Sequence, residues 1–120
     1  MTGVASSPPH IHTTTVGYRL VVSIDGDMTS GSTDTLSAAL REALVSAERD
    51  IWIDLTGVTE IDPAAIAVLV SAHRELASDH RSLAVICPAG PVHTALDCAD
   101  AAGRLPIFPD RASAHYYRAS

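Results

Sequence analysis

The chain has 120 residues, which is the length of one domain. Its formal net charge is -6 at pH 7, and its eight basic residues are all arginines scattered along the sequence. Nucleic acids and anionic membranes bind to concentrated basic surfaces, so this composition argues against both partners and is compatible with a basic protein partner. Only 4% of the residues are aromatic, so we expect a core of Val, Ile, Leu and Ala.

The N-terminal segment and the hydropathy of the chain predict a cytoplasmic protein without a membrane segment. Residues 1–15 contain no Lys or Arg, which a signal peptide would carry. The longest apolar run, residues 63–70, is less than half of the roughly 20 residues that span a bilayer. Residues 1–9 end in Pro8-Pro9 and are predicted to be a flexible tail, and residues 10–118 are predicted to be one domain.

Strand and helix patterns alternate from the start of that domain. Residues 10–15 predict a short edge strand, and residues 19–24 a stronger strand that Asp25-Gly26-Asp27 ends with turn chemistry. A helix follows the polar loop at residues 30–33. Its apolar side chains recur at helical spacing: Leu36, Ala39, Leu40, Ala43, Leu44 and Ala47.

The second half continues the alternation. Residues 50–55 predict a strand, and Asp62-Pro63 is a clear helix start, since Asp is a good N-cap and Pro suits the first helical position. That helix is expected to reach about Asp79. Further elements are a strand over 83–87, a helix from Val92 that stops at Gly103, a strand over 105–108 and a helical turn over 112–118. This order predicts an α/β domain: a mixed, mostly parallel sheet of four or five strands with helices packed against it.

Five carboxylates follow predicted strands and could converge, which would suit Mg²⁺. They are Asp25, Asp27, Asp54, Glu60 and Asp62. A phosphate-binding site of that kind usually has a Lys or a Gly-rich loop beside it, and the chain contains no Lys. The favoured interpretation is therefore structural: Asp25 and Asp27 form a turn, Asp54 and Glu60 are solvated, and Asp62 caps a helix.

Histidine and cysteine give little support for chemistry. The six histidines have no metal-site spacing, and His73 is expected beside the core. Cys87 and Cys98 are a possible redox pair, although a free cysteine usually only packs. No Gly-x-Ser-x-Gly elbow is present, so we predict a binding protein without catalytic residues, cofactor or metal, and not an enzyme.

The most informative segment is the predicted helix start. After Asp62, residues 63–70 are apolar on every face, whereas a surface helix normally has a polar side. The first turns are therefore either buried on all sides or carry an exposed patch of small apolar residues. Such a patch would be a flat docking surface for another protein.

This segment resembles the core of the STAS domain of anti-sigma factor antagonists. Residues 53–69 read IDLTGVTEIDPAAIAVL, where the family has approximately hydrophobic-Asp-Leu-Ser-x-Val-x-x-hydrophobic-Asp-Ser-Ser-Gly-Leu. Gly26-Asp27-Met28-Thr29 corresponds to the family's Gly-Glu-hydrophobic-Asp loop. The order of the later strands and helices also matches, so the resemblance covers residues 10–118.

The resemblance implies that the chain, as a monomer or weak dimer, binds an anti-sigma factor of the histidine-kinase-like ATPase type. In the family, that partner switches the antagonist off by phosphorylating the hydroxyl residue after the Asp. Here Pro63 occupies the phosphoacceptor slot, and Ala64 and Ala65 follow where Ser or Thr and Gly are usual. The implied partner-binding residues are Asp27, Thr29, Asp62, Pro63, Ala64, Ala65, Ala67 and Val68.

Two alternatives stay open. STAS domains also serve as subunits of other assemblies, such as stress-signalling or lipid-transport complexes. A nucleotide-binding module is a further alternative, against which the missing Lys and Gly-rich loop argue.

Overall fold

A computed structural model of the chain describes residues 10–28, 33–46, 49–99 and 105–114. These residues form a sheet and four helices, which confirms the predicted mixed α/β fold. In chain order the elements are β1 (His10–Val16), β2 (Arg19–Met28), α1 (Thr33–Leu44), β3 (Asp50–Ile61), α2 (Pro63–Ser78), β4 (Ser82–Ile86), α3 (Pro91–Cys98), β5 (Ile107–Phe108) and α4 (Arg111–Ala114).

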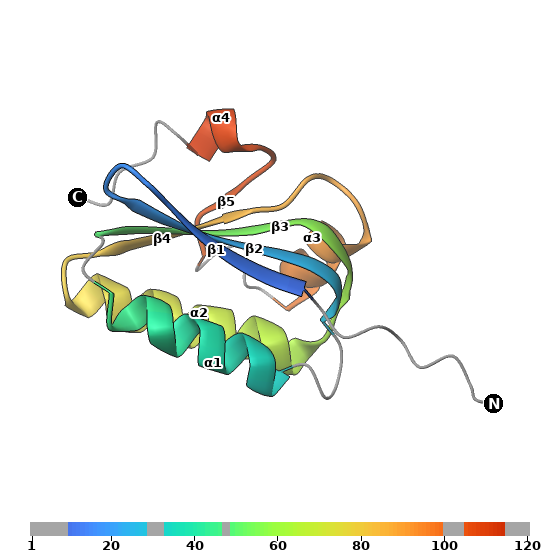
Figure 1. Ribbon diagram of the computed structural model, residues 1–120. Coiled ribbons are helices and arrows are strands. Elements are labelled where there is room, and N and C mark those ends of the chain that lie inside the picture. Colours follow the sequence, from blue (N-terminus) through green and yellow to red (C-terminus); the bar gives the residue numbers. More distant parts are fainter. Residues whose placement is uncertain (1–9, 29–32, 47–48, 100–104, 115–120) are drawn as a thin grey trace.

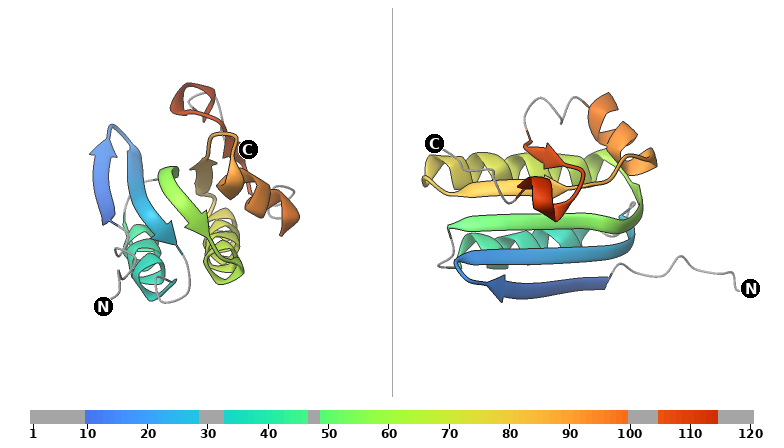
Figure 2. Two further views of the ribbon diagram at one scale, coloured as in Figure 1. Left: turned by 90° about the vertical axis from the view of Figure 1, so that its right-hand side faces the viewer. Right: turned by 90° about the horizontal axis from the view of Figure 1, so that it is seen from above.

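The strands lie in the sheet in their sequence order, from β1 to β5. β1 is antiparallel to β2, and the other neighbouring strands are parallel. Helices α1 and α2 lie side by side against one face of the sheet, and α4 lies over the opposite face (Figures 1 and 2). Because β2, β3 and β4 run in the same direction, their carboxyl ends meet at one edge of the sheet, where α2 and α3 begin.

The main core lies between the sheet and helices α1, α2 and α3. Strand residues at alternate positions point into it, as the period of two requires. The helices contribute side chains spaced three or four residues apart, because those positions share one helix face. Members from the helices include Leu36, Leu40, Ala43, Ala65, Ile66, Leu69, Ala72, Leu76, Val92 and Leu96.

The opposite face of the sheet carries a smaller core of Val21, Trp52, Ala84 and Ile86, which pack with Ala114. Strand β3 is therefore buried on both faces, which explains why residues 51–53 are apolar without alternation. At the rim of this core, the Arg19 guanidinium lies 3.7 Å from the centre of the Trp52 ring. This contact is a cation–π interaction that covers the exposed side of the ring.

The turn predicted at Asp25-Gly26-Asp27 is wrong, because β2 continues through these residues to Met28. Pairing with β3 extends the strand, with irregular register after Ser23 and after Gly26. A Cβ at Gly57 would lie 1.8 Å from Asp25 Oδ1, so a larger residue there would require the exposed Asp25 side chain to move. The predicted tail, the stop at Gly103 and residues 115–118 lie outside the described residues.

The interpretation of Asp54 as a solvated residue is also wrong. Its side chain is buried, and its carboxylate accepts hydrogen bonds from the Thr56 backbone N–H at 2.9 Å and from the Thr56 hydroxyl. Arg111 of α4 adds two contacts, from Nε at 2.8 Å and Nη2 at 2.7 Å. Burial acts to raise the pKa of Asp54, but the hydrogen bonds of Thr56 and Arg111 outweigh it and hold the pKa below its ordinary value.

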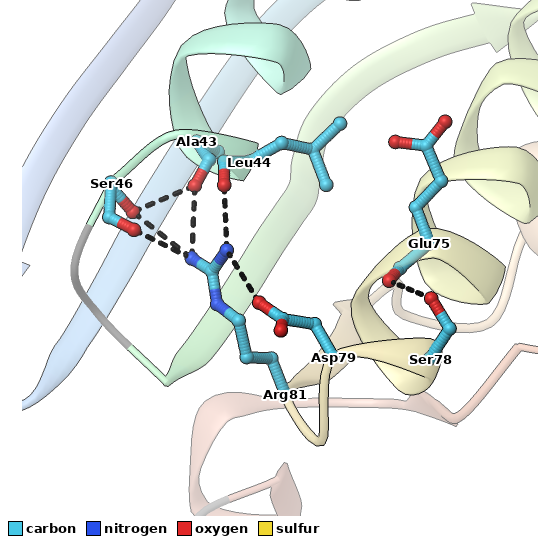
Figure 3. A network of polar contacts seen from close by, with 7 residues as sticks. All are labelled: Ala43, Leu44, Ser46, Glu75, Ser78, Asp79 and Arg81. Carbon is cyan, nitrogen blue, oxygen red and sulfur yellow. Dashed lines mark hydrogen bonds and ion pairs between the residues drawn. The ribbon is translucent and has the colours of Figure 1, made fainter.

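Helix α2 ends in a turn that positions a long-range cap for α1. His80 has a φ of 58°, and the N–H groups of Arg81 and His80 donate to the carbonyls of Leu76 and Ala77. This is the Schellman pattern, which usually has glycine at the left-handed position. Arg81 leaves the turn and donates to the carbonyls of Leu44 at 2.6 Å and of Ala43 and Ser46 at 3.1 Å (Figure 3). A positive charge therefore satisfies the last carbonyls of α1.

We expect Arg81→Ala to lower the free energy of unfolding by about 1.5–3 kcal/mol, because charge-assisted bonds to several carbonyls are lost together. Urea unfolding followed by circular dichroism measures this change. Asp79→Ala is the matched control, since its carboxylate lies 4.0 Å from Arg81 and is 75% exposed. Asp79→Ala should lower the free energy of unfolding by less than about 0.5 kcal/mol. An equal loss of stability in both variants would contradict the capping role of Arg81.

We expect Asp54→Asn to lower the free energy of unfolding by about 1–3 kcal/mol at neutral pH, because the carboxylate holds Arg111 and Thr56. A carboxyl whose folded-state pKa is depressed contributes stability above its ordinary value of 3.8 and loses it as pH falls toward the folded-state pKa. The difference between wild type and variant should therefore shrink below about pH 4. Urea titrations across pH measure it, with the exposed Glu42→Gln as control. A difference that stays constant with pH would contradict this role of the carboxylate.

Candidate functional site

Asp62 starts helix α2 as the sequence predicted. Its backbone is extended, and its carboxylate accepts a hydrogen bond from the Ala65 N–H at 3.1 Å. Pro63 is the first helical residue, where the missing N–H leaves nothing unsatisfied. The Asp62 carbonyl accepts the Ile66 N–H at 3.2 Å, so both the backbone and the side chain of Asp62 bond to the first turn. The predicted N-cap is confirmed.

The same residue ties α2 to the end of β2. The Asp62 N–H donates to the Met28 carbonyl at 3.0 Å, and Met28 pairs with Ile61 in the sheet. Beside this bond, the Thr59 hydroxyl donates to the Asp27 carboxylate at 3.1 Å. The structure therefore brings Asp27 and the start of α2, which are far apart in the sequence, to one edge of the sheet. Thr29, the other predicted loop residue, lies outside the described residues.

The first turns of α2 are divided between the core and the surface. Ala65, Ile66 and Leu69 are buried and face the sheet. Pro63, Ala64 and Ala67 are exposed and Val68 is half-buried; we call these four residues the α2 patch. The exposed apolar surface proposed from the sequence therefore exists, although only on one side of the helix.

Ala65 is a correction to the predicted set of contact residues. Its side chain is 0% exposed, because it lies on the same helix face as Leu69 and Ala72 in the main core. A partner at the surface cannot touch it. A small residue at this position still allows the helix to pack closely against the sheet.

The α2 patch continues into a groove between α1 and α2. The groove has a volume of about 410 Å³, and Ala67, Val68 and Ala72 of α2 line it together with Leu40 and Leu44 of α1. Its rim carries opposite charges from the two helices, Arg41 and Glu75. A partner that covers the α2 patch would meet a shallow, largely apolar surface with polar groups at its edge.

The two cysteines are free thiols in different environments. Cys87 is buried and Cys98 is exposed. Burial raises the pKa of Cys87, and the carboxylate of Asp97 adds to this effect. A raised pKa lowers the thiolate fraction, which disfavours reaction at Cys87. The redox pair stays a hypothesis that the geometry does not favour.

The remaining candidate chemistry is not assembled in the described part of the chain. Among the described residues, no group of three or more His, Cys, Asp or Glu side chains could hold a metal ion. His73 is half-buried, and burial lowers its pKa, in line with a position beside the core. A second hollow of about 310 Å³ lies between the second half of β3 and the start of α3, and its lining includes Thr56, Thr59 and Cys87. Within the described ranges, no helix is long and apolar enough to cross a membrane.

Comparisons with known proteins agree with this architecture. A family model described as Mlab, STAS domain, matches residues 11–107. An anti-sigma factor antagonist from Mycobacterium paratuberculosis superposes with a TM-score of 0.84 at 16% identity, over 92% of this chain and 96% of that one. A putative anti-sigma factor antagonist from Thermotoga maritima gives 0.79 at 15% identity, over 88% and 91%.

The unphosphorylated anti-sigma factor antagonist SpoIIAA gives a TM-score of 0.72 at 12% identity, over 88% of this chain and 93% of that one. No curated protein matches the sequence. Identities this low establish a common fold and nothing finer, whereas the family match covers most of the chain. The chain therefore belongs to the STAS domain family, and its fold is that of the anti-sigma factor antagonists.

Proposed function

We propose that this chain is an anti-sigma factor antagonist that binds an anti-sigma factor of the histidine-kinase-like ATPase type. The observation that carries the proposal is the α2 patch: small apolar side chains exposed at the start of a helix that Asp62 fixes to the sheet. The fold shared with known antagonists supports a regulator of this kind. Its role is binding and not catalysis.

The composition of the α2 patch suits protein docking. Proline and alanine side chains lose almost no rotamer freedom when a partner covers them, so the entropic cost of binding is small. Their small size lets a partner's backbone approach the helix closely. Asp27 and Asp62 are half-buried beside the patch, and their carboxylates favour a partner with basic groups at the rim of its own surface.

Pro63 makes this antagonist insensitive to phosphorylation in the family's acceptor slot. Proline has no hydroxyl, and the residues after it, Ala64 and Ala65, have none either. We propose that phosphorylation of this slot therefore does not regulate partner binding. Of the hydroxyls close to this slot in the sequence, Thr56 bonds to Asp54 and Thr59 bonds to Asp27.

A second candidate function is a STAS subunit of another assembly, such as a lipid-transport complex. The description of the matching family, Mlab, STAS domain, does not itself name an anti-sigma factor antagonist, so this candidate stays open. Affinity purification from the native cell with mass spectrometry distinguishes the two. Recovery of a kinase-like ATPase anti-sigma factor supports the first function, and recovery of transporter subunits alone supports the second.

We expect Ala67→Glu to weaken binding of the anti-sigma factor at least about a hundredfold, because an unpaired charge in a desolvated contact costs several kcal/mol. Isothermal titration calorimetry measures the affinity, and thermal unfolding checks the fold. Ala77→Glu is the matched control, since Ala77 is an exposed alanine at the other end of the same helix. Equal affinities for wild type and Ala67→Glu would show that the partner binds elsewhere.

We expect Pro63→Ser to create a phosphoacceptor, because Asp62 still caps the helix and serine is tolerated in its first turn. With the cognate anti-sigma factor and ATP, intact-mass spectrometry should find one phosphate on the variant and none on the wild type. The added charge of about -1.5 to -2 should weaken binding.

Pro63→Ala is the control, since it removes the ring without adding a hydroxyl. Pro63→Ala should stay unphosphorylated and should bind the anti-sigma factor as the wild type does. Stoichiometric phosphate on Thr56, Thr59 or Ser71 of the wild type would contradict the loss of the phosphoswitch.

A further inference from the structure

Strand β1 is a long, exposed edge of the sheet. It spans His10–Val16 and pairs with β2 along its whole length, and within the described residues no strand lies on its other side. The opposite edge is β5, which has only two residues. Six of the seven residues of β1 are exposed, and Ile11 is half-buried. A strand in this position offers unpaired backbone groups to another strand.

The turn after β1 shows which backbone groups are unpaired. Gly17 has a φ of 64° and begins a two-residue turn that Val16 and Arg19 flank, as in a type II′ hairpin. The flanking pair of such a turn is hydrogen-bonded, and hydrogen-bonded pairs then alternate along the strands. Counting back from Val16, the N–H and C=O groups of Ile11, Thr13 and Thr15 point to the free edge.

This edge lacks the features that usually prevent pairing. Natural edge strands are protected by charged residues, proline, bulges or short length. β1 reads HIHTTTV, without Lys, Arg, Asp, Glu or Pro, and its register with β2 is regular over all seven residues. Five of the seven residues are threonine, isoleucine or valine, which favour extended structure. The strand is therefore suited to pair with another strand.

We propose that β1 pairs antiparallel with β1 of a second copy, so that two sheets join into one across a two-fold axis at Thr13. In this register Ile11 lies opposite Thr15 of the second copy, and Thr13 lies opposite its own counterpart. The three outward-facing residues of each strand then form about six interchain hydrogen bonds. The contact is isologous, because each strand supplies the same groups that it receives.

The side chains on the opposite face of β1 favour pairing with a second copy of this chain. Val16 is 53% exposed, one of the three large hydrophobic residues that are exposed in the described structure. The two-fold register sets Val16 opposite His10 of the second copy, in a non-hydrogen-bonded pair where side chains approach closely. His10 already stacks on His12, with ring centres 6.5 Å apart. Pairing would thus cover Val16 with an aromatic stack.

This edge does not include the α2 patch, although His10 at one end of it pairs with Asp25, near the end of β2. Helix α1 lies between the β1 side of the sheet and α2, as the end-on view shows (Figure 2). A dimer formed through β1 would carry two α2 patches, both free to bind a partner. The oligomeric state tests the proposed dimer and partner binding tests the proposed docking function, so one proposal can fail while the other holds.

Sedimentation equilibrium of the purified full chain tests the dimer directly. We expect a reversible monomer–dimer equilibrium for the wild type and a monomer for Thr13→Pro, which removes an outward N–H that the sheet itself does not use. Thr13→Lys is the second variant. It sets two like charges opposite each other across the axis and leaves the backbone unchanged. Circular dichroism and urea unfolding establish that both variants are folded.

Tyr18→Ser is the matched control, since Tyr18 is 89% exposed at the hairpin tip and lies outside the paired residues. It should dimerise like the wild type. A wild type that is monomeric at every concentration up to its solubility limit would overturn the proposal. Dimers that persist in folded Thr13→Lys would also overturn it, since they would have to form through another surface.

Discussion

The hydrogen bonds of Asp62 are the constraint on which the proposed docking surface depends. Its N–H is bound to the end of β2, and its carboxylate caps the first turn of α2. One residue therefore fixes both the position and the direction of the helix start relative to the sheet. A surface held in this way needs little ordering when a partner arrives, so more of the contact energy is available for affinity. Pro63 adds to this rigidity because its ring restricts φ.

Helix α2 presents apolar residues both to the core and to the surface. Leu69, Ala72 and Leu76 pack beneath the sheet, while Ala67 and Val68 line a groove that faces outward. A polar outer face would solubilise such a helix better, so the apolar outer residues are unfavourable for an isolated domain. Their presence at the helix end that Asp62 anchors to β2 is understandable if another protein covers them. The contacts of Arg81 with α1 and of Arg111 with Asp54 stabilise parts of the fold away from this surface.

Local patterns predicted much of the fold and the helix start at the candidate site, and long-range contacts account for what they missed. Asp62-Pro63 contains its own capping chemistry, so the helix start could be predicted from two residues. The extension of β2 through Asp25 to Met28 could not, because pairing with β3, and with β1 at Asp25, overrides the turn propensity of that segment. Arg111 is 57 residues from Asp54, and no periodicity connects them. The left-handed His80 has no sequence signal either, since the usual residue at that position is glycine. Ala65 is among the contact residues that the resemblance implies, and a helix that is apolar on every face over residues 63–70 does not by itself reveal that this side chain faces the core.

We propose that the start of α2 and the end of β2 together bind the partner. Amide chemical-shift mapping of the isotope-labelled chain during titration with its unlabelled anti-sigma factor tests this directly. We expect the largest shifts to cluster at residues 26–28 and 59–68, with small shifts along β4 and α4. Shifts concentrated on the opposite face of the sheet, around Trp52 and Arg111, with residues 59–68 unchanged, would contradict it.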